Sequence, residues 1–215
     1  MDIISNIRIG PRLLIGFIIV ILLMGLVGVI GFIGMNSISI GMDKVYSDGT
    51  IPLLEVSEIE TSLNSIRALV FRIVAIPAER TQDYDRITSE IQKIDEKIAR
   101  LKTVSLSPDV QQNLKKFEEQ WNAYKSAAQG VFSLLSEGNT NEALVSIANG
   151  GEHSNARRAT VDTFEKLKSG ILAHAEQIAQ EGQAEKDRTV PVMIILGFLA
   201  VIIALGFAFA VTRSI

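Results

Sequence analysis

The chain has 215 residues, enough to bury a core in one or two domains, and its formal net charge is −3. This charge offers no basic patch of the kind that nucleic-acid binding requires, so no nucleic-acid partner is expected. The sequence contains no cysteine, which excludes disulfides and thiolate metal sites. Charged residues make up 21% of the chain. They are absent from two long segments of the chain.

The two uncharged segments, 13–33 and 190–211, have the length of membrane spans. A helix needs about 20 apolar residues to cross the hydrocarbon layer of a bilayer. The apolar region of a cleaved signal peptide is shorter, about 7–15 residues, and ends in an A-x-A-like site. The sequence GFIGMNSIS matches such a site poorly. The first segment is therefore expected to remain as an anchor, and the second to bring the chain back across the membrane.

Basic residues beside the two segments predict their orientation. Arg8 and Arg12 precede the first, and Arg213 follows the second. Because positive residues accumulate on the cytoplasmic side, both termini are expected in the cytoplasm, although Lys186 and Arg188 argue mildly the other way. The expected organisation is a cytoplasmic N-terminus at 1–12, spans at 13–35 and 190–211, an extracytoplasmic domain at 36–189 and a cytoplasmic end at 212–215.

Between the spans, apolar residues recur at alternating steps of three and four, which is the period of packed helices. Steps that average 3.5 residues keep each seam facing a partner, as in four-helix bundles. The sequence therefore predicts an all-α fold, an up-down-up-down four-helix bundle whose first and last helices continue into the two transmembrane helices. The expected bundle helices are 36–76, 82–102, 108–137 and 152–189.

Proline, glycine and capping residues mark the expected ends of these helices. Pro77 ends the first helix and leaves Thr81 to cap the second. Ser107 is the expected N-cap of the third. The glycine-containing pairs at 138–139 and 150–151 separate the third helix from the last.

The expected helix lengths also bear on assembly. Only the first and last helices are long enough to reach from the membrane to the far end of the bundle. Near the membrane these two helices alone have too few neighbours to bury their apolar faces, so a homodimer is expected. A bend is expected in the first helix near Gly49 and Pro52.

Several segments resemble the N-terminal sensor half of methyl-accepting chemotaxis proteins, the type with a four-helix-bundle ligand-binding domain. The matching segments are NIRIGPRLLIGF at the first span, MDKVYSDGTIPLLEVSEIETSLNSIRALVFRIV with Tyr46, Pro52-Leu53 and Arg67, FEEQWNAYKSAAQGVFSLLSEGNTNEALVSI with Gly138 and Ala143, and AVTRSI at the end. AVTRSI is similar to the first residues of a HAMP linker. The HAMP and signalling domains of that family would follow Ile215, so the chain is expected to be a piece of a longer protein.

The resemblance implies a chemoreceptor sensor in the inner (cytoplasmic) membrane of a bacterium or archaeon, crossing it more than once, with the sensor domain outside. It would bind a small ligand or a ligand-loaded periplasmic binding protein and need no cofactor. It would act as a homodimer, with higher-order receptor arrays as a further form. The signal would pass through the second transmembrane helix to the HAMP and signalling domains.

Other functions remain open at this point. The same sensor module also precedes histidine kinases and cyclic-dinucleotide enzymes, and the residues up to 215 do not distinguish these outputs. A different class of function is a structural, membrane-anchored bundle that binds no ligand. An enzyme is not expected, because no nucleophile–base pair or metal set is recognisable. His153 and His174 lie too far apart along one helix to share a metal ion.

Arginines are the expected binding residues, because small chemoeffectors are commonly carboxylates and a guanidinium group grips a carboxylate with two hydrogen bonds. Arg67 lies beside the seam of the first helix. Arg157 lies in the seam of the last helix, with Arg158 adjacent and the Thr160 hydroxyl one turn on. The candidate ligand-binding residues are therefore Arg67, Arg157, Arg158 and Thr160. The alternative is that the arginines lie on the surface or pair with nearby acids.

Small residues recur in both spans and predict close helix packing. Ala200, Ala204 and Ala208 repeat every four residues in the second span. In the first span, glycines repeat every three residues from Gly25 to Gly34, which defines a face less sharply.

Overall fold

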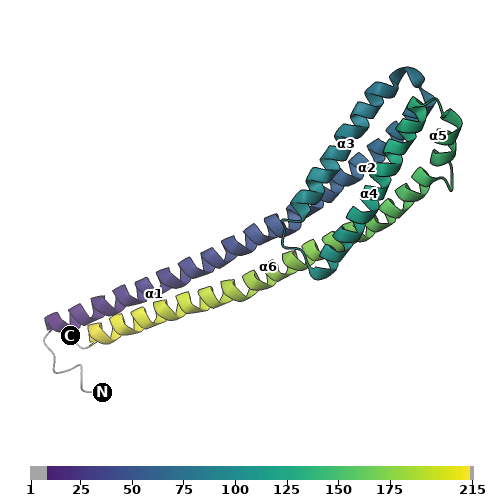
Figure 1. Ribbon diagram of the computed structural model, residues 1–215. Coiled ribbons are helices and arrows are strands. Elements are labelled where there is room, and N and C mark those ends of the chain that lie inside the picture. The colour runs from purple at the N-terminus through teal and green to yellow at the C-terminus, as the bar shows by residue number, and fades with distance from the viewer. Residues whose placement is uncertain (1–8, 214–215) are drawn as a thin grey trace. The chain divides into compact units, whose positions relative to one another are not determined.

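The computed structural model describes residues 9–213, and all of their regular structure is helical (Figure 1). The chain divides into two compact units. The bundle unit is Lys44–Ala179, and the span unit combines Met1–Asp43 with Gln180–Ile215. Arg8 and the end of the 212–215 segment lie outside the described residues, as do the side chains of Arg12 and Arg213.

The bundle unit confirms the predicted all-α four-helix bundle. Its long helices are α2 (Ile51–Ala75), α3 (Arg80–Leu101), α4 (Pro108–Ser136) and the first part of α6 (Glu152–Arg213). Shorter elements are the π-helix η1 (Val45–Thr50), the 3₁₀ turn η2 (Pro77–Glu79) and the helix α5 (Thr140–Ile147). The glycine positions predicted to end α4 and to precede α6 have positive φ, +85° at Gly138 and +90° at Gly150, as chain reversals require.

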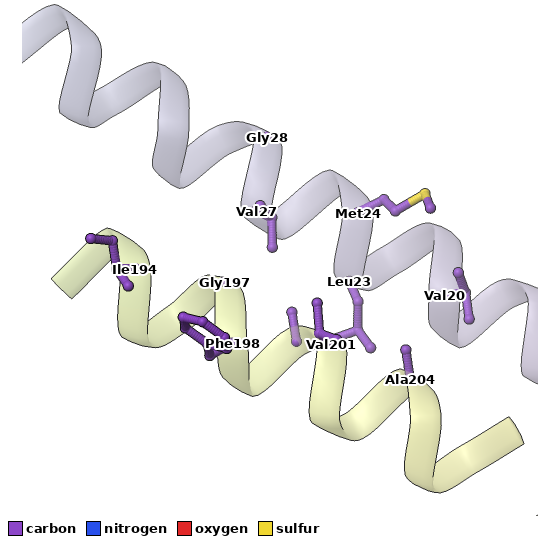
Figure 2. A pocket seen from close by; sticks show the side chains of 11 residues that line it. Val20, Leu23, Met24, Val27, Gly28, Ile194, Gly197, Phe198, Val201 and Ala204 are labelled. Atoms are coloured by element: carbon purple, nitrogen blue, oxygen red, sulfur yellow. The ribbon is translucent and has the colours of Figure 1, made fainter. Parts of the chain in front are cut away.

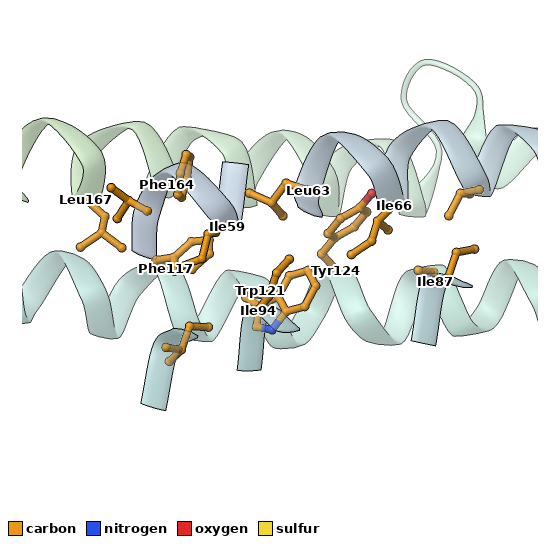
Figure 3. Packing of buried hydrophobic residues seen from close by; sticks show 14 of the residues in the cluster. Ile59, Leu63, Ile66, Ile87, Ile94, Phe117, Trp121, Tyr124, Phe164 and Leu167 are labelled. Atoms are coloured by element: carbon orange, nitrogen blue, oxygen red, sulfur yellow. The ribbon is translucent and has the colours of Figure 1, made fainter. Parts of the chain in front are cut away.

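The apolar seams predicted from the sequence meet in one core (Figure 3). Phe117 of α4 lies against Phe164 of α6, with ring centroids 5.5 Å apart. On the other side of the core, Trp121 donates a 2.7 Å hydrogen bond from its indole nitrogen to Asp95 of α3. An ion pair of 2.6 Å between Lys168 and Glu60 joins α6 to α2 at the surface. These contacts join α4 to α6, α4 to α3 and α6 to α2.

Two details differ from the predictions. Helix α3 begins at Arg80, so Thr81 lies inside the helix and does not cap it. The turn η2 holds this earlier start, because the Arg80 Nε donates to the Ile73 carbonyl at 2.7 Å and Arg72 pairs with Glu79. The segment after Gly138 also folds into a short helix, α5, which no apolar stripe predicted.

At the predicted bend, the chain forms the π-helix η1. The N–H of Ile51 donates to the carbonyl of Tyr46, five residues earlier. Pro52, in the first turn of α2, has no N–H to donate. Gly49 is buried in η1 and faces α6, where an added Cβ would lie 3.7 Å from the Cβ of Ala175. π-Helical turns are rare and occur mostly as single turns inside α-helices, as here between α1 and α2.

The span unit contains the two helical segments that are long and apolar enough to cross a membrane, one in α1 (Ile9–Lys44) and one in α6. An apolar groove of about 760 Å³ lies between them, with Leu23 facing Val201 across it (Figure 2). The predicted glycine face is limited to one position. A Cβ on Gly34 would collide with the Met193 side chain, whereas Gly25 has nothing within 4 Å.

Candidate functional site

Two of the predicted ligand-binding residues lie on different helices of the bundle and act on the same side chain. Arg67 extends from the exposed side of α2, and Arg157 is half-buried on α6. Burial raises the pKa of the Tyr124 hydroxyl on α4, and the positive charges of Arg157 and Arg67 both act against this rise. Within residues 9–213, neither arginine makes a hydrogen bond or an ion pair.

The lack of partners sets Arg67 and Arg157 apart from other arginines of the bundle. Arg72 pairs with the buried carboxylate of Asp83 at 3.2 Å. Arg100 lies 3.4 Å from Glu55, which is also almost fully buried. Within residues 9–213, Arg67 and Arg157 therefore differ from these arginines in making no ion pair with an acidic side chain.

Tyr124 places a polar group inside the bundle. Only 1% of the residue is exposed, and its hydroxyl has no hydrogen-bond partner among the described residues. Figure 3 shows the ring extending from α4 with the hydroxyl turned towards α2, near Ile66. Burial raises the pKa of this hydroxyl, and the charges of Arg157 and Arg67 oppose that effect only in part. Tyr124 is therefore a neutral hydrogen-bond donor.

His153 is the second buried polar group of this region. Only 1% of it is exposed, its ring lies 5.1 Å from that of Tyr124, and its Nε2 has no hydrogen-bond partner among the described residues. Its backbone N–H is placed by Ser146 of α5, whose Oγ accepts at 3.4 Å. Burial, and then the charge of Arg157, lower the pKa of His153 to about 4, so the imidazole is neutral near pH 7.

The other two predicted residues have partners inside the protein. Arg158 is exposed and donates to Asn149 in the turn before α6, and to the Ser154 Oγ at 3.4 Å. Thr160 is fully buried, with its hydroxyl 2.9 Å from the Gln120 carbonyl of α4. Both side chains thus support the local packing of α6, whereas Arg157, directly before Arg158, has no hydrogen-bond or ion-pair partner among residues 9–213.

The arrangement is well suited to an anion. We call Arg67, Tyr124, His153 and Arg157 the cationic cluster. It offers two guanidinium groups and two neutral groups able to donate a hydrogen bond, and it includes no carboxylate. Within residues 9–213, no group of three or more His, Cys, Asp and Glu side chains could hold a metal ion.

The sequence predicted Arg67 and Arg157 as binding residues, but not the other two members of the cationic cluster. Tyr124 and His153 both lie on helix seams, where an aromatic ring or a histidine is usually a packing residue. The signal that could have marked them is their chemistry. Each puts a polar atom into a seam whose other members are apolar, and such atoms are normally paired when buried.

Comparison with known proteins identifies the family. No curated protein and no solved structure matches the chain. The family model described as a four-helix bundle sensory module for signal transduction matches residues 6–185, which include the cationic cluster and every helix of the bundle unit. The chain therefore belongs to the family of four-helix-bundle sensory modules for signal transduction, as its resemblance to the sensor half of methyl-accepting chemotaxis proteins implied.

Proposed function

We propose that this chain is the sensor half of a transmembrane receptor of the chemotaxis type, in which the bundle unit binds a small extracellular ligand and α6 carries the signal to a cytoplasmic domain. The observation that carries the proposal is the make-up of α6. This single helix, Glu152–Arg213, holds two residues of the cationic cluster, His153 and Arg157, and also the second apolar segment. A displacement of α6 at the cationic cluster would therefore be transmitted along the same helix to its membrane-spanning segment.

The proposal includes the organisation expected from the sequence. Residues 13–35 and 190–211 would span the membrane, 36–189 would lie outside the cytoplasm, and a HAMP linker would begin at 212. The receptor would act as a homodimer in a bacterial or archaeal inner membrane, able to join receptor arrays, and a periplasmic binding protein could deliver the ligand. Sensory modules of this family are not typically catalytic.

Signalling of this kind needs two arrangements of the bundle with different affinities for the ligand. A ligand that binds both equally shifts nothing, however tightly it binds. The unpaired charge of Arg67 and Arg157 supplies a physical basis for such a difference, because a ligand can compensate that charge in one arrangement better than in the other.

A hybrid receptor tests this function. The chain would be joined after Ile215 to the HAMP and signalling domains of a chemoreceptor and expressed in a bacterium without receptors of its own. We expect at least one compound of a chemoeffector library to change kinase output. A hybrid that is present in the membrane and sets a basal kinase activity, yet responds to no compound, would contradict the proposal and favour a ligand-free structural bundle.

The same experiment leaves the natural output open. A sensor that precedes a histidine kinase or a cyclic-dinucleotide enzyme would also give a responsive hybrid. The residues that follow Ile215 in the complete gene distinguish these outputs directly.

A further inference from the structure

We propose that the cationic cluster is a carboxylate-binding site in the interior of a single protomer, formed by Arg67, Tyr124, His153 and Arg157. The inference rests on the proposed sensory function, for which it names the class of ligand and the place where it binds. Arg158 and Thr160, which the sequence also suggested, are not part of this site, because their polar groups are bonded within the protein.

The first argument is charge. Arg67 and Arg157 come from two helices, both act on the Tyr124 hydroxyl, and neither has an acidic partner among residues 9–213. Two like charges that act on one buried hydroxyl also repel each other, and a nearby anion relieves that repulsion. A carboxylate compensates both and can accept two parallel hydrogen bonds from a guanidinium group.

The second argument is hydrogen bonding. The Tyr124 hydroxyl and the His153 Nε2 are buried and unpaired within the described part of the chain. Each can donate, the imidazole in its Nε2–H tautomer, and a carboxylate oxygen accepts from both. An amine or ammonium group would instead be repelled by the two guanidinium groups. The set of donors therefore selects an acceptor-rich anion over a cation.

The third argument links binding to movement. Because Tyr124 and His153 are each only 1% exposed, a ligand reaches them only when α6 separates locally from α2 and α4. The arrangement described here is then the ligand-free one, and the anion stabilises a second one in which its oxygens take the place of the missing partners. The ligand would thus act on α6 directly, at the second and sixth residues of that helix.

The chain contains its own reporter of this event. Trp121 is the only tryptophan in the sequence, and its ring lies 5.9 Å from that of Tyr124. Full-length chain in lipid nanodiscs would be titrated with acetate, succinate, malate, citrate and aspartate, with inorganic phosphate and a series of amines in separate arms, while Trp121 fluorescence and the thermal midpoint are followed. We expect a saturable response to at least one carboxylate and none to the amines.

Variants locate the binding. Arg157→Gln and Arg67→Gln should each raise the dissociation constant of the responding carboxylate by about 10-fold or more. Arg158→Gln, which removes the neighbouring charge on α6, should leave it within about 2-fold. Tyr124→Phe keeps the ring and removes the donor, and should weaken binding without loss of folding. Helix content by circular dichroism checks that each variant is folded.

Several outcomes would overturn the inference. These are equal effects of Arg157→Gln and Arg158→Gln in folded proteins, a response to phosphate alone, or no saturable response to any carboxylate. A hybrid receptor that responds to an uncharged compound or an amine through other residues would leave the proposed sensory function in place while removing this site. A hybrid that responds to nothing would remove both.

Discussion

Tyr124 and His153 lie side by side in the bundle interior with their ring centroids 5.1 Å apart and their planes at 48°, and neither the Tyr124 hydroxyl nor the His153 Nε2 has a hydrogen-bond partner in the described chain. Two such groups in one place oppose folding, because a buried donor without an acceptor costs about 1–3 kcal/mol. Sites that trade stability for binding are expected to show this pattern, and it makes the stability of the bundle a direct test of the structure.

Removal of the unpaired hydroxyl should stabilise the ligand-free protein. Tyr124→Phe keeps the aromatic ring in the core and removes only the oxygen that lacks a partner, so the unfolding free energy should rise by about 1 kcal/mol. The thermal midpoint, followed by Trp121 fluorescence, measures the change. Tyr46→Phe is the matched control, because Tyr46 is 61% exposed and its hydroxyl is solvated. A lower midpoint for Tyr124→Phe than for Tyr46→Phe would show that the Tyr124 hydroxyl is paired in the folded protein.

Acid should destabilise the bundle through His153. The folded protein holds the pKa of His153 at about 4, below the ordinary value of 6.5, so the unfolded chain takes up a proton first as the pH falls. The stabilisation is complete above about pH 6.5 and is lost progressively between pH 6.5 and 4. It amounts to about 1.4 kcal/mol per pH unit within that window, and to about 3 kcal/mol in all.

The measurement is the unfolding free energy of the full chain at several pH values between 7 and 4. His153→Gln should reduce its slope in this window. Parallel curves for the wild type and His153→Gln would mean that His153 is solvated or paired in the folded state.

The sequence predicted those parts of the fold that depend on periodicity. The seams through Ile59, Phe117 and Phe164 are buried as expected, because a residue's position along a helix decides which face it occupies. Glycine at 138 and 150 marked the chain reversals correctly, since positive φ is a property of a single residue.

The remaining features depend on contacts between segments, which a sequence does not display. The early start of α3 comes from Arg72 and Arg80, whose side chains hold the preceding turn. Tyr124 and His153 looked like packing residues because their seam positions are apolar in character. Only the three-dimensional arrangement shows that their polar atoms lack partners.

The hydrogen bond between Trp121 and Asp95 should contribute measurably to stability. The indole N–H donates to the Asp95 Oδ1 at 2.7 Å, and Trp121 is only 1% exposed. Asp95→Ala removes the acceptor and should lower the unfolding free energy by about 1–2 kcal/mol, with a change in the Trp121 emission maximum. Asp95→Asn keeps an acceptor oxygen and should cost less, although it loses the ion pair with Lys125 at 2.9 Å. Equal midpoints for Asp95→Ala and the wild type would contradict the bond.

Two glycines of the bundle unit should respond to alanine in opposite ways. Gly130 lies on the exposed face inside α4, and an added Cβ meets nothing within 4 Å, so Gly130→Ala should stabilise the protein by up to about 1 kcal/mol through its better helix propensity. Gly151 lies directly before α6, where a Cβ would overlap the backbone carbonyl groups of Val145 and Ser146. Because these backbone atoms of α5 cannot move aside as a flexible side chain can, Gly151→Ala should destabilise the protein by about 1–3 kcal/mol.

The difference between the two variants is more informative than either value. Both add one methyl group to a glycine, so effects of the substitution on the unfolded chain are similar and largely cancel. Thermal midpoints of the full-length variants, measured side by side, should move in opposite directions. If Gly151→Ala were as stable as Gly130→Ala, the turn that places His153 and Arg157 at the start of α6 would differ from the one described, and the cationic cluster would lose its geometric basis.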